Sequence, residues 1–199
     1  SQTLEGALTT LPGARIVYPS FADDAAGLLR TSMRSKGFTL FLEPKALYNA
    51  VEAATVVPDD FEVPFGTARI RREGTDLSII TYGNTTHFCL AVAERLAKEY
   101  NWSVEVIDLR SLIPLDKETI FESVKKTSKV LVVHEDKVFS GFGAEIAAMI
   151  GTELFRYLDA PIQRVGSIFT PVGFHPNLEN AILPGEERIY KAAKELLEY

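Results

Sequence analysis

Residues that could catalyse a reaction or hold a metal are few in this sequence. The three histidines are His87, His134 and His175, and Cys89 is the only cysteine. No two histidines stand at metal-ligand spacing, and one cysteine cannot form a thiolate cluster, so the sequence offers no zinc-type ligand set. No Gly-x-Ser-x-Gly segment is present either, which argues against an α/β-hydrolase. Cys89 lies in a helical pattern and is predicted to be a buried small residue. We therefore assign no catalytic and no metal-binding residue.

One glycine-rich segment deserves comparison with nucleotide-binding loops. Gly141-Phe142-Gly143 follows an apolar run and opens a helical pattern. The order resembles the start of a dinucleotide fingerprint, but the third glycine is missing. The alternative is a flexible turn into a helix N-terminus, which could still receive an anionic group. We assign no cofactor-binding residue from this segment.

Polar residues follow two of the apolar runs, where open parallel sheets place ligands and partners. At Asp108-Leu109-Arg110 we expect the charged side chains to pair with each other or with the next loop. At His134 two interpretations stay open: a loop histidine bonded to a neighbouring carboxylate, or a contact with another subunit. We predict the subunit or partner contact for six residues of this turn, which are His134, Glu135, Asp136, Gly141, Phe142 and Gly143.

The composition excludes several classes of partner. The chain has 199 residues, of which 46% are hydrophobic and 24% charged, with a formal net charge of −6. Nucleic acid is not an expected partner, because its binding needs clustered Lys and Arg. No apolar run approaches the roughly 20 residues that span a bilayer, so no membrane contact is predicted. A single cysteine suits a reducing compartment.

The elements that must position these residues alternate along the chain. Apolar runs predict strands at 14–18, 39–43, 77–82, 104–109, 130–134 and 162–165, with an edge strand at 68–71. Helical spacing of apolar residues occurs within 25–33, 88–100, 120–124, 146–157 and 189–197, and Asp116 is the expected N-cap of the third helix. Near-continuous apolar strands joined by helices predict an α/β fold, with a mostly parallel sheet flanked by helices on both faces.

A break in this alternation predicts two domains. Residues 49–66 show no sustained period and contain Pro58, Pro64 and Gly66. A loop of this length is unusual inside a compact domain. We therefore predict a partial α/β domain at 1–48, a linker at 49–66 and a complete domain at 67–199.

Seven strings occur together in the order of one known family. They are LPGARIVYPS (11–20), LEPKALY (42–48), TYG (81–83), VEVIDLRSLIPLD (104–116), VVHED (132–136), GFGAEIA (141–147) and LDAPIQRV (158–165). The set resembles the β subunit of the decarboxylating component of 2-oxoacid dehydrogenases, in the transketolase-like superfamily. LEPKALY favours the branched-chain, 2-oxoisovalerate type. The resemblance implies that 1–48 is the C-terminal remnant of a pyrimidine-binding domain and that 67–199 is a transketolase-like C-terminal domain.

The resemblance also implies a function and a set of partners. The parent enzyme would decarboxylate a 2-oxoacid on thiamine diphosphate and Mg, and pass the acyl group to lipoamide. In this family a catalytic histidine directly precedes a Ser-Gln pair like Ser1-Gln2, and the Mg-diphosphate site belongs to the α half. We therefore expect this chain alone to be inactive.

Expected partners are the α half, separate or fused, a second β half across a two-fold axis, and the subunit-binding domain of the lipoyl acyltransferase. The expected location is the bacterial cytoplasm, or the mitochondrial matrix of a eukaryote.

Two other interpretations stay open. The chain could be a stand-alone α/β interaction module with no enzyme parent. It could also be the C-terminal part of another transketolase-like enzyme, such as transketolase itself, deoxyxylulose-phosphate synthase or 2-oxoacid:ferredoxin oxidoreductase. The strings LEPK and VVHED together disfavour these relatives.

Overall fold

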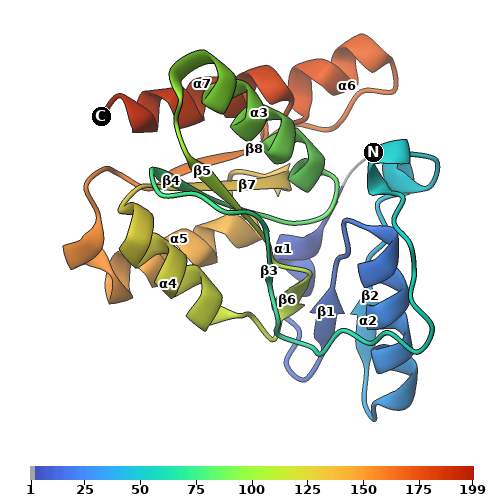
Figure 1. Cartoon of the computed structure of the whole chain (residues 1–199). Helices are drawn as coiled ribbons and strands as arrows, with labels where there is room; N and C mark the ends of the chain where they lie inside the picture. Colours follow the sequence, from blue (N-terminus) through green and yellow to red (C-terminus); the bar gives the residue numbers. More distant parts are fainter. Residues whose placement is uncertain (1–2) are drawn as a thin grey trace.

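The structure is a computed structural model that describes residues 3–199, and its strands form two sheets (Figure 1). The strands are β1 (Arg15–Val17), β2 (Thr39–Phe41), β3 (Arg69–Arg72), β4 (Leu77–Thr81), β5 (Val104–Asp108), β6 (Ser111–Ile113), β7 (Val130–Lys137) and β8 (Gln163–Ser167). The α-helices are α1 (Glu5–Leu8), α2 (Ala22–Arg34), α3 (Thr85–Tyr100), α4 (Lys117–Thr127), α5 (Phe142–Glu153), α6 (Pro176–Ile182) and α7 (Glu186–Leu197). Three short 3₁₀ helices are η1 (Lys45–Leu47), η2 (Val51–Ala53) and η3 (Phe155–Tyr157).

The larger sheet confirms the predicted mostly parallel α/β fold. Its order is β3-β5-β4-β7-β8, and every neighbouring pair is parallel except β3 with β5. Helices α3 and α7 lie on one face, and α4 and α5 lie on the other (Figure 1). All five residues of β4 and of β5 are buried, which is the burial expected of a sheet covered on both sides.

Local sequence explains where the predicted helices begin and end. The Asp116 carboxylate caps α4 as predicted, because its Oδ1 accepts a hydrogen bond of 3.1 Å from the Thr119 amide. Helix α3 ends where Asn101 adopts a left-handed φ of 59°, a conformation that asparagine tolerates better than most residues. None of the helices among residues 3–199 is long and apolar enough to cross a bilayer.

The smaller sheet joins the N-terminal segment to the rest of the chain. Its order is β2-β1-β6, with β2 parallel and β6 antiparallel to β1. Strand β6 comes from the region after residue 67, and sequence patterning did not predict it. Ile16 and Tyr18 share a core cluster with Ile107 and Leu109 of the larger domain. The segment 1–48 therefore does not complete a sheet by itself.

The predicted linker is held against α2. The Arg30 guanidinium donates hydrogen bonds to the carbonyls of Pro58 and Phe61, at 3.2 and 2.9 Å. Val63 is fully buried in a small cluster with Leu28. Residues 49–66 thus form an ordered, irregular connection, and the division into 1–48, 49–66 and 67–199 stays a prediction.

A buried charge network fastens α2 to the larger domain. The Arg110 guanidinium donates to Asp24 Oδ1 at 2.8 Å, and Arg71 pairs with both Asp24 and Asp108. The Arg110 amide donates to Asp108 Oδ1 at 3.3 Å, but the two charged groups pair with Asp24 and Arg71 and not with each other as expected. The guanidinium instead turns toward the start of α2, because a buried carboxylate there requires compensation. Burial raises the pKa of Asp108 above its ordinary value, and Arg71 opposes that rise.

Candidate functional site

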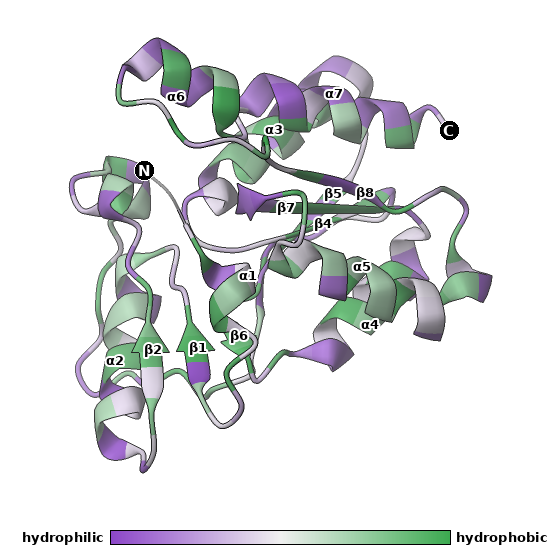
Figure 2. Ribbon diagram, turned by 180° about the vertical axis from the view of Figure 1, so that it is seen from behind, coloured by the Kyte–Doolittle hydropathy of each residue, from purple (hydrophilic) through white to green (hydrophobic). Residues whose placement is uncertain are grey.

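The candidate site lies at the carboxyl end of β7, which is longer than predicted. The strand continues to Lys137 because Lys137 pairs with Ser167 of β8 after a register irregularity. His134, Glu135 and Asp136 are therefore on a strand and not in a loop. Figure 2 shows β7 changing from hydrophobic to hydrophilic toward its arrowhead. This end of the strand faces the segment that contains α1 (Figure 1).

His134 is a core residue of this site. Its side chain is fully buried and its ring is stacked with that of Tyr82, with a centroid distance of 6.3 Å and an interplanar angle of 5°. Within residues 3–199 neither ring nitrogen has a hydrogen-bond partner. The loop interpretation, with the ring bonded to a carboxylate, was therefore wrong. Burial lowers the pKa of His134 from 6.5 to about 4, so the ring is neutral at physiological pH.

The predicted glycines allow the close packing around this ring. A Cβ at Gly143 would lie 2.4 Å from His134 Nε2, and one at Gly141 would lie 2.1 Å from the Lys137 carbonyl oxygen. Neither distance is compatible with a side chain. Gly141 is the N-cap of α5 and Phe142 is its first residue, as the glycine-rich turn predicted. The turn brings α5 directly onto β7.

Asp136 connects the site to the N-terminal helix. Its Oδ2 accepts a hydrogen bond of 3.0 Å from the Gly6 amide of α1, and its Oδ1 accepts one of 2.8 Å from Lys137 N. Sequence reasoning missed α1 and its buried carboxyl, Glu5. Burial, with added repulsion from Asp136 and Glu135, raises the pKa of Glu5 from 4.5 to about 7. The signal was present in the sequence as a lone acid within an apolar four-residue stretch.

Glu135 is the most accessible of the three predicted site residues on this strand, His134, Glu135 and Asp136. Its carboxylate accepts a hydrogen bond of 3.3 Å from Asn84 Nδ2, and burial raises its pKa. The Ser167 hydroxyl donates to the Glu135 carbonyl. Of the six predicted contact residues, Glu135 is half-buried and the other five are buried within the chain. Their role in subunit contact stays a prediction, and any such contact would rest on the surface that they support.

An exposed aromatic pair lies beside this buried cluster. Phe139 follows β7 and Phe169 follows β8, and their rings are 4.8 Å apart. Their side chains are 66% and 71% exposed, and the neighbouring Ile168 is 50% exposed. We call Phe139, Ile168 and Phe169 the carboxyl-edge patch. Large apolar residues gathered at one edge of a sheet are typical of an interaction surface. The predicted contact turn from His134 to Gly143 contains Phe139, but the exposed rings were not among the six predicted contact residues.

The described residues do not bring together a cluster of metal ligands. Within residues 3–199 no three His, Cys, Asp or Glu side chains come together in a way that could hold a metal ion. The carboxyls of Glu5, Glu135 and Asp136 lie near one another, but hydrogen bonds from amides engage Glu135 and Asp136. The position of the expected catalytic histidine, directly before Ser1-Gln2, lies outside the described residues.

Comparison with known proteins identifies the class to which this fold belongs. Residues 66–189 match the family described as the transketolase C-terminal domain. The whole arrangement also resembles a solved split-gene transketolase β4 tetramer, described as inactive, with a TM-score of 0.78 and 22% sequence identity over 97% of this chain. This likeness supports the assignment of the fold alone. The chain belongs to the transketolase C-terminal domain family.

Sequence relatives give a narrower grouping, the β subunits of 2-oxoacid dehydrogenases. The chain is 40% identical over its whole length to the 2-oxoisovalerate dehydrogenase subunit beta of Bacillus subtilis, covering 61% of that protein. It is also 40% identical to the pyruvate dehydrogenase E1 component subunit beta of Rickettsia felis, covering 60% of it. The yeast mitochondrial counterpart is 42% identical over 94% of this chain and 52% of its own length. The chain thus spans about half to three-fifths of the length of these relatives. It matches the branched-chain and the pyruvate type of subunit equally well.

Proposed function

We propose that this chain is the supporting part of the β half of a thiamine-diphosphate-dependent 2-oxoacid dehydrogenase. Its similarity to β subunits along its whole length carries the proposal. In the parent enzyme, thiamine diphosphate would supply the electron sink for decarboxylation, and Mg would bind its diphosphate. The family resemblance implies that the Mg-diphosphate site belongs to the α half. The contribution of this chain is to hold subunits together and to dock the lipoyl acyltransferase.

The carboxyl-edge patch is the surface that we assign to the second β half. Its aromatic rings are exposed, yet they stand on a rigid base formed by the ends of β7 and β8. Rigid aromatic residues surrounded by polar ones make effective contact anchors. Phe139 lies within the turn from His134 to Gly143, between the buried residues Asp136 and Gly141. The six predicted residues would therefore act by positioning the patch.

We propose 2-oxoisovalerate and related branched-chain acids as the substrates of the parent enzyme. The resemblance of LEPKALY to the branched-chain subunits supports this choice over pyruvate. The substrate can be tested in the parent enzyme by comparing kcat/KM for 2-oxoisovalerate and pyruvate. A ratio that favours pyruvate would overturn the substrate assignment and leave the β-half assignment unaffected.

The assignment to a multienzyme complex is tested with this chain itself. We expect the chain to give no turnover of 2-oxoisovalerate with thiamine diphosphate, Mg and an artificial electron acceptor. We also expect isothermal titration calorimetry to detect binding of the acyltransferase subunit-binding domain. Turnover by the chain alone would contradict its supporting role. Absence of binding at domain concentrations up to the millimolar range would remove the docking function.

A further inference from the structure

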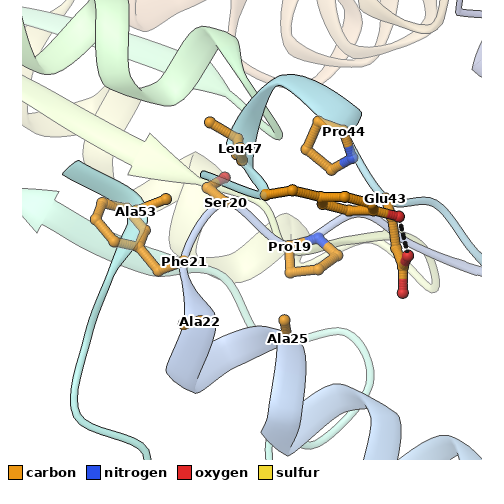
Figure 3. Close-up of a pocket in the computed structure, with 10 residues that line it drawn as sticks. Pro19, Ser20, Phe21, Ala22, Ala25, Glu43, Pro44, Leu47 and Ala53 are labelled. Carbon is orange, nitrogen blue, oxygen red and sulfur yellow. Dashed lines mark hydrogen bonds between the residues drawn. The ribbon is translucent and has the colours of Figure 1, made fainter. Parts of the chain in front are cut away.

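An apolar pocket lies away from the candidate site, between the start of α2 and the segment after β2 (Figure 3). Its volume is about 250 Å³, and it opens to solvent. Figure 3 shows Ala22 and Ala25 of α2 on one side and Pro44 and Leu47 on the opposite side. The remaining lining residues are Pro19, Ser20, Phe21, Glu43, Tyr48 and Ala53. The pocket is smaller than the roughly 300–1,000 Å³ of a drug-sized site and suits one or two side chains.

The walls of this pocket are fixed although much of the segment around them is irregular. Thr55 Oγ1 accepts a hydrogen bond of 2.8 Å from the Asp23 amide and donates one of 3.0 Å to Asp23 Oδ1. At the rim, the Tyr48 hydroxyl donates to Glu43 Oε2 at 2.6 Å. Ala53, the last residue of η2, is buried. A long irregular segment held in one conformation is more typical of a binding surface than of a spacer.

The surroundings of the pocket combine exposed apolar side chains with negative charge. Val51 is 84% exposed and Val56 is 89% exposed. Among the lining residues, all within the described part of the chain, Glu43 is the one with a charge. Residues 43–62 contain five acids and one lysine, a net charge of −4, and Arg34 of α2 pairs with one of these acids, Glu62. A complementary partner would carry an apolar side chain flanked by cations.

The geometry points to a docking site for a basic peptide segment of a partner protein, which inserts one leucine-sized apolar side chain between α2 and η1. The lining alanines and Leu47 would surround the inserted side chain. The carboxylate of Glu43 would attract a neighbouring lysine or arginine. Burial of a leucine side chain would supply most of the affinity, and the exposed ion pair would add selectivity.

Three capped pentapeptides test this proposal. The probe is acetyl-Gly-Lys-Leu-Lys-Gly amide, and the comparators replace its leucine by serine or both lysines by glutamate. The measurement is the change in amide chemical shifts of the ¹⁵N-labelled chain during titration. We expect changes within residues 20–25 and 44–55. Affinity for the serine peptide should be at least about ten-fold weaker, since burying a leucine is worth more than 1.4 kcal/mol. The glutamate peptide should also bind more weakly than the probe, but it should lose less affinity than the serine peptide because the ion pair is exposed.

Two variants and one control separate the pocket from the general surface. Ala25→Leu fills the cavity and should weaken the probe at least about ten-fold, whereas Ala26→Leu is the control on the same helix outside the lining. Glu43→Gln keeps an acceptor for Tyr48 and should weaken the probe about two- to five-fold. The unbound spectra report whether each variant is folded.

Three outcomes would overturn the proposal. In the first, the serine peptide binds as well as the leucine peptide. In the second, the probe binds Ala25→Leu as well as the original chain. In the third, the same amides shift with protein concentration alone, which would assign the pocket to a second copy of the chain.

Discussion

Glu5 allows the sharpest test of how the N-terminal helix is held. Its side chain is 1% exposed, and burial raises its pKa from 4.5 to about 7, with smaller contributions from Asp136 and Glu135. The substitution Glu5→Gln keeps the size of the side chain and removes its ability to ionise. Any pH-dependent loss in the free energy of unfolding that this carboxyl causes should therefore disappear in the variant.

The size and sign of the effect follow from the pKa. The folded chain holds the Glu5 proton more tightly than the unfolded chain, so stability falls as pH rises from 4.5 through about 7. At about 1.36 kcal/mol per pH unit the full cost is roughly 3 kcal/mol, reached near pH 8. Below pH 4.5 both states are protonated and the cost vanishes. Glu5→Gln should thus be about 3 kcal/mol more stable than the original chain at pH 8, and within about 1 kcal/mol of it at pH 5.

Urea unfolding at the two pH values provides the measurement. The control is Glu122→Gln, which makes the same chemical change at an exposed position of α4. It should change stability by less than about 0.5 kcal/mol at either pH. A Glu5→Gln variant that gains no stability between pH 5 and pH 8 relative to the original chain would refute the reasoning.

Three further predictions concern the packing and charge of the core. Gly143→Ala places a Cβ against the His134 ring and should cost about 1–3 kcal/mol in urea unfolding, whereas Gly185→Ala, with open space around it, should be nearly neutral. Burial lowers the pKa of His134 to about 4, so the folded chain loses stability as pH falls from 6.5 to about 4. The variant His134→Gln should therefore flatten the acid side of a plot of Tm against pH. An unchanged acid side would contradict this prediction. Asp24→Ala leaves the buried Arg71 guanidinium with less compensation and should cost about 3–5 kcal/mol by chemical unfolding, and a cost below about 1 kcal/mol would show that the network is not needed.

Periodicity predicted the elements that bury continuous apolar faces. The central strands and the helices α2, α3, α4, α5 and α7 were recognised because each carries enough apolar residues to establish a period. Strand β6 was missed because three residues cannot show alternation, and its pairing with β1 is a tertiary contact. Helix α6 was missed because it begins at a His175 N-cap followed by proline and buries none of its residues.

The sequence predicted where the candidate site lies, but it did not predict the burial and the contacts of the site residues. The strand end and the glycine turn are where the sequence placed them. The sequence placed His134 at the end of a strand at 130–134 and left a loop contact open, because nothing local indicates that β8 extends the pairing to Lys137. The contacts of Glu5 and Gly6 with this site join residues about 130 positions apart, and no local pattern reports such contacts.

The proposed role of the chain is to support assembly through its carboxyl-edge patch. Phe139→Ser combined with Phe169→Ser removes both exposed rings, and Phe155→Ser removes a ring of similar exposure, 75%, at the other end of the sheet. The decisive measurement is sedimentation velocity over a range of protein concentrations. We predict that the original chain and Phe155→Ser form dimers, and that the double variant sediments as a folded monomer. A monomeric original chain at every concentration, or a dimer that survives the double substitution, would contradict the account.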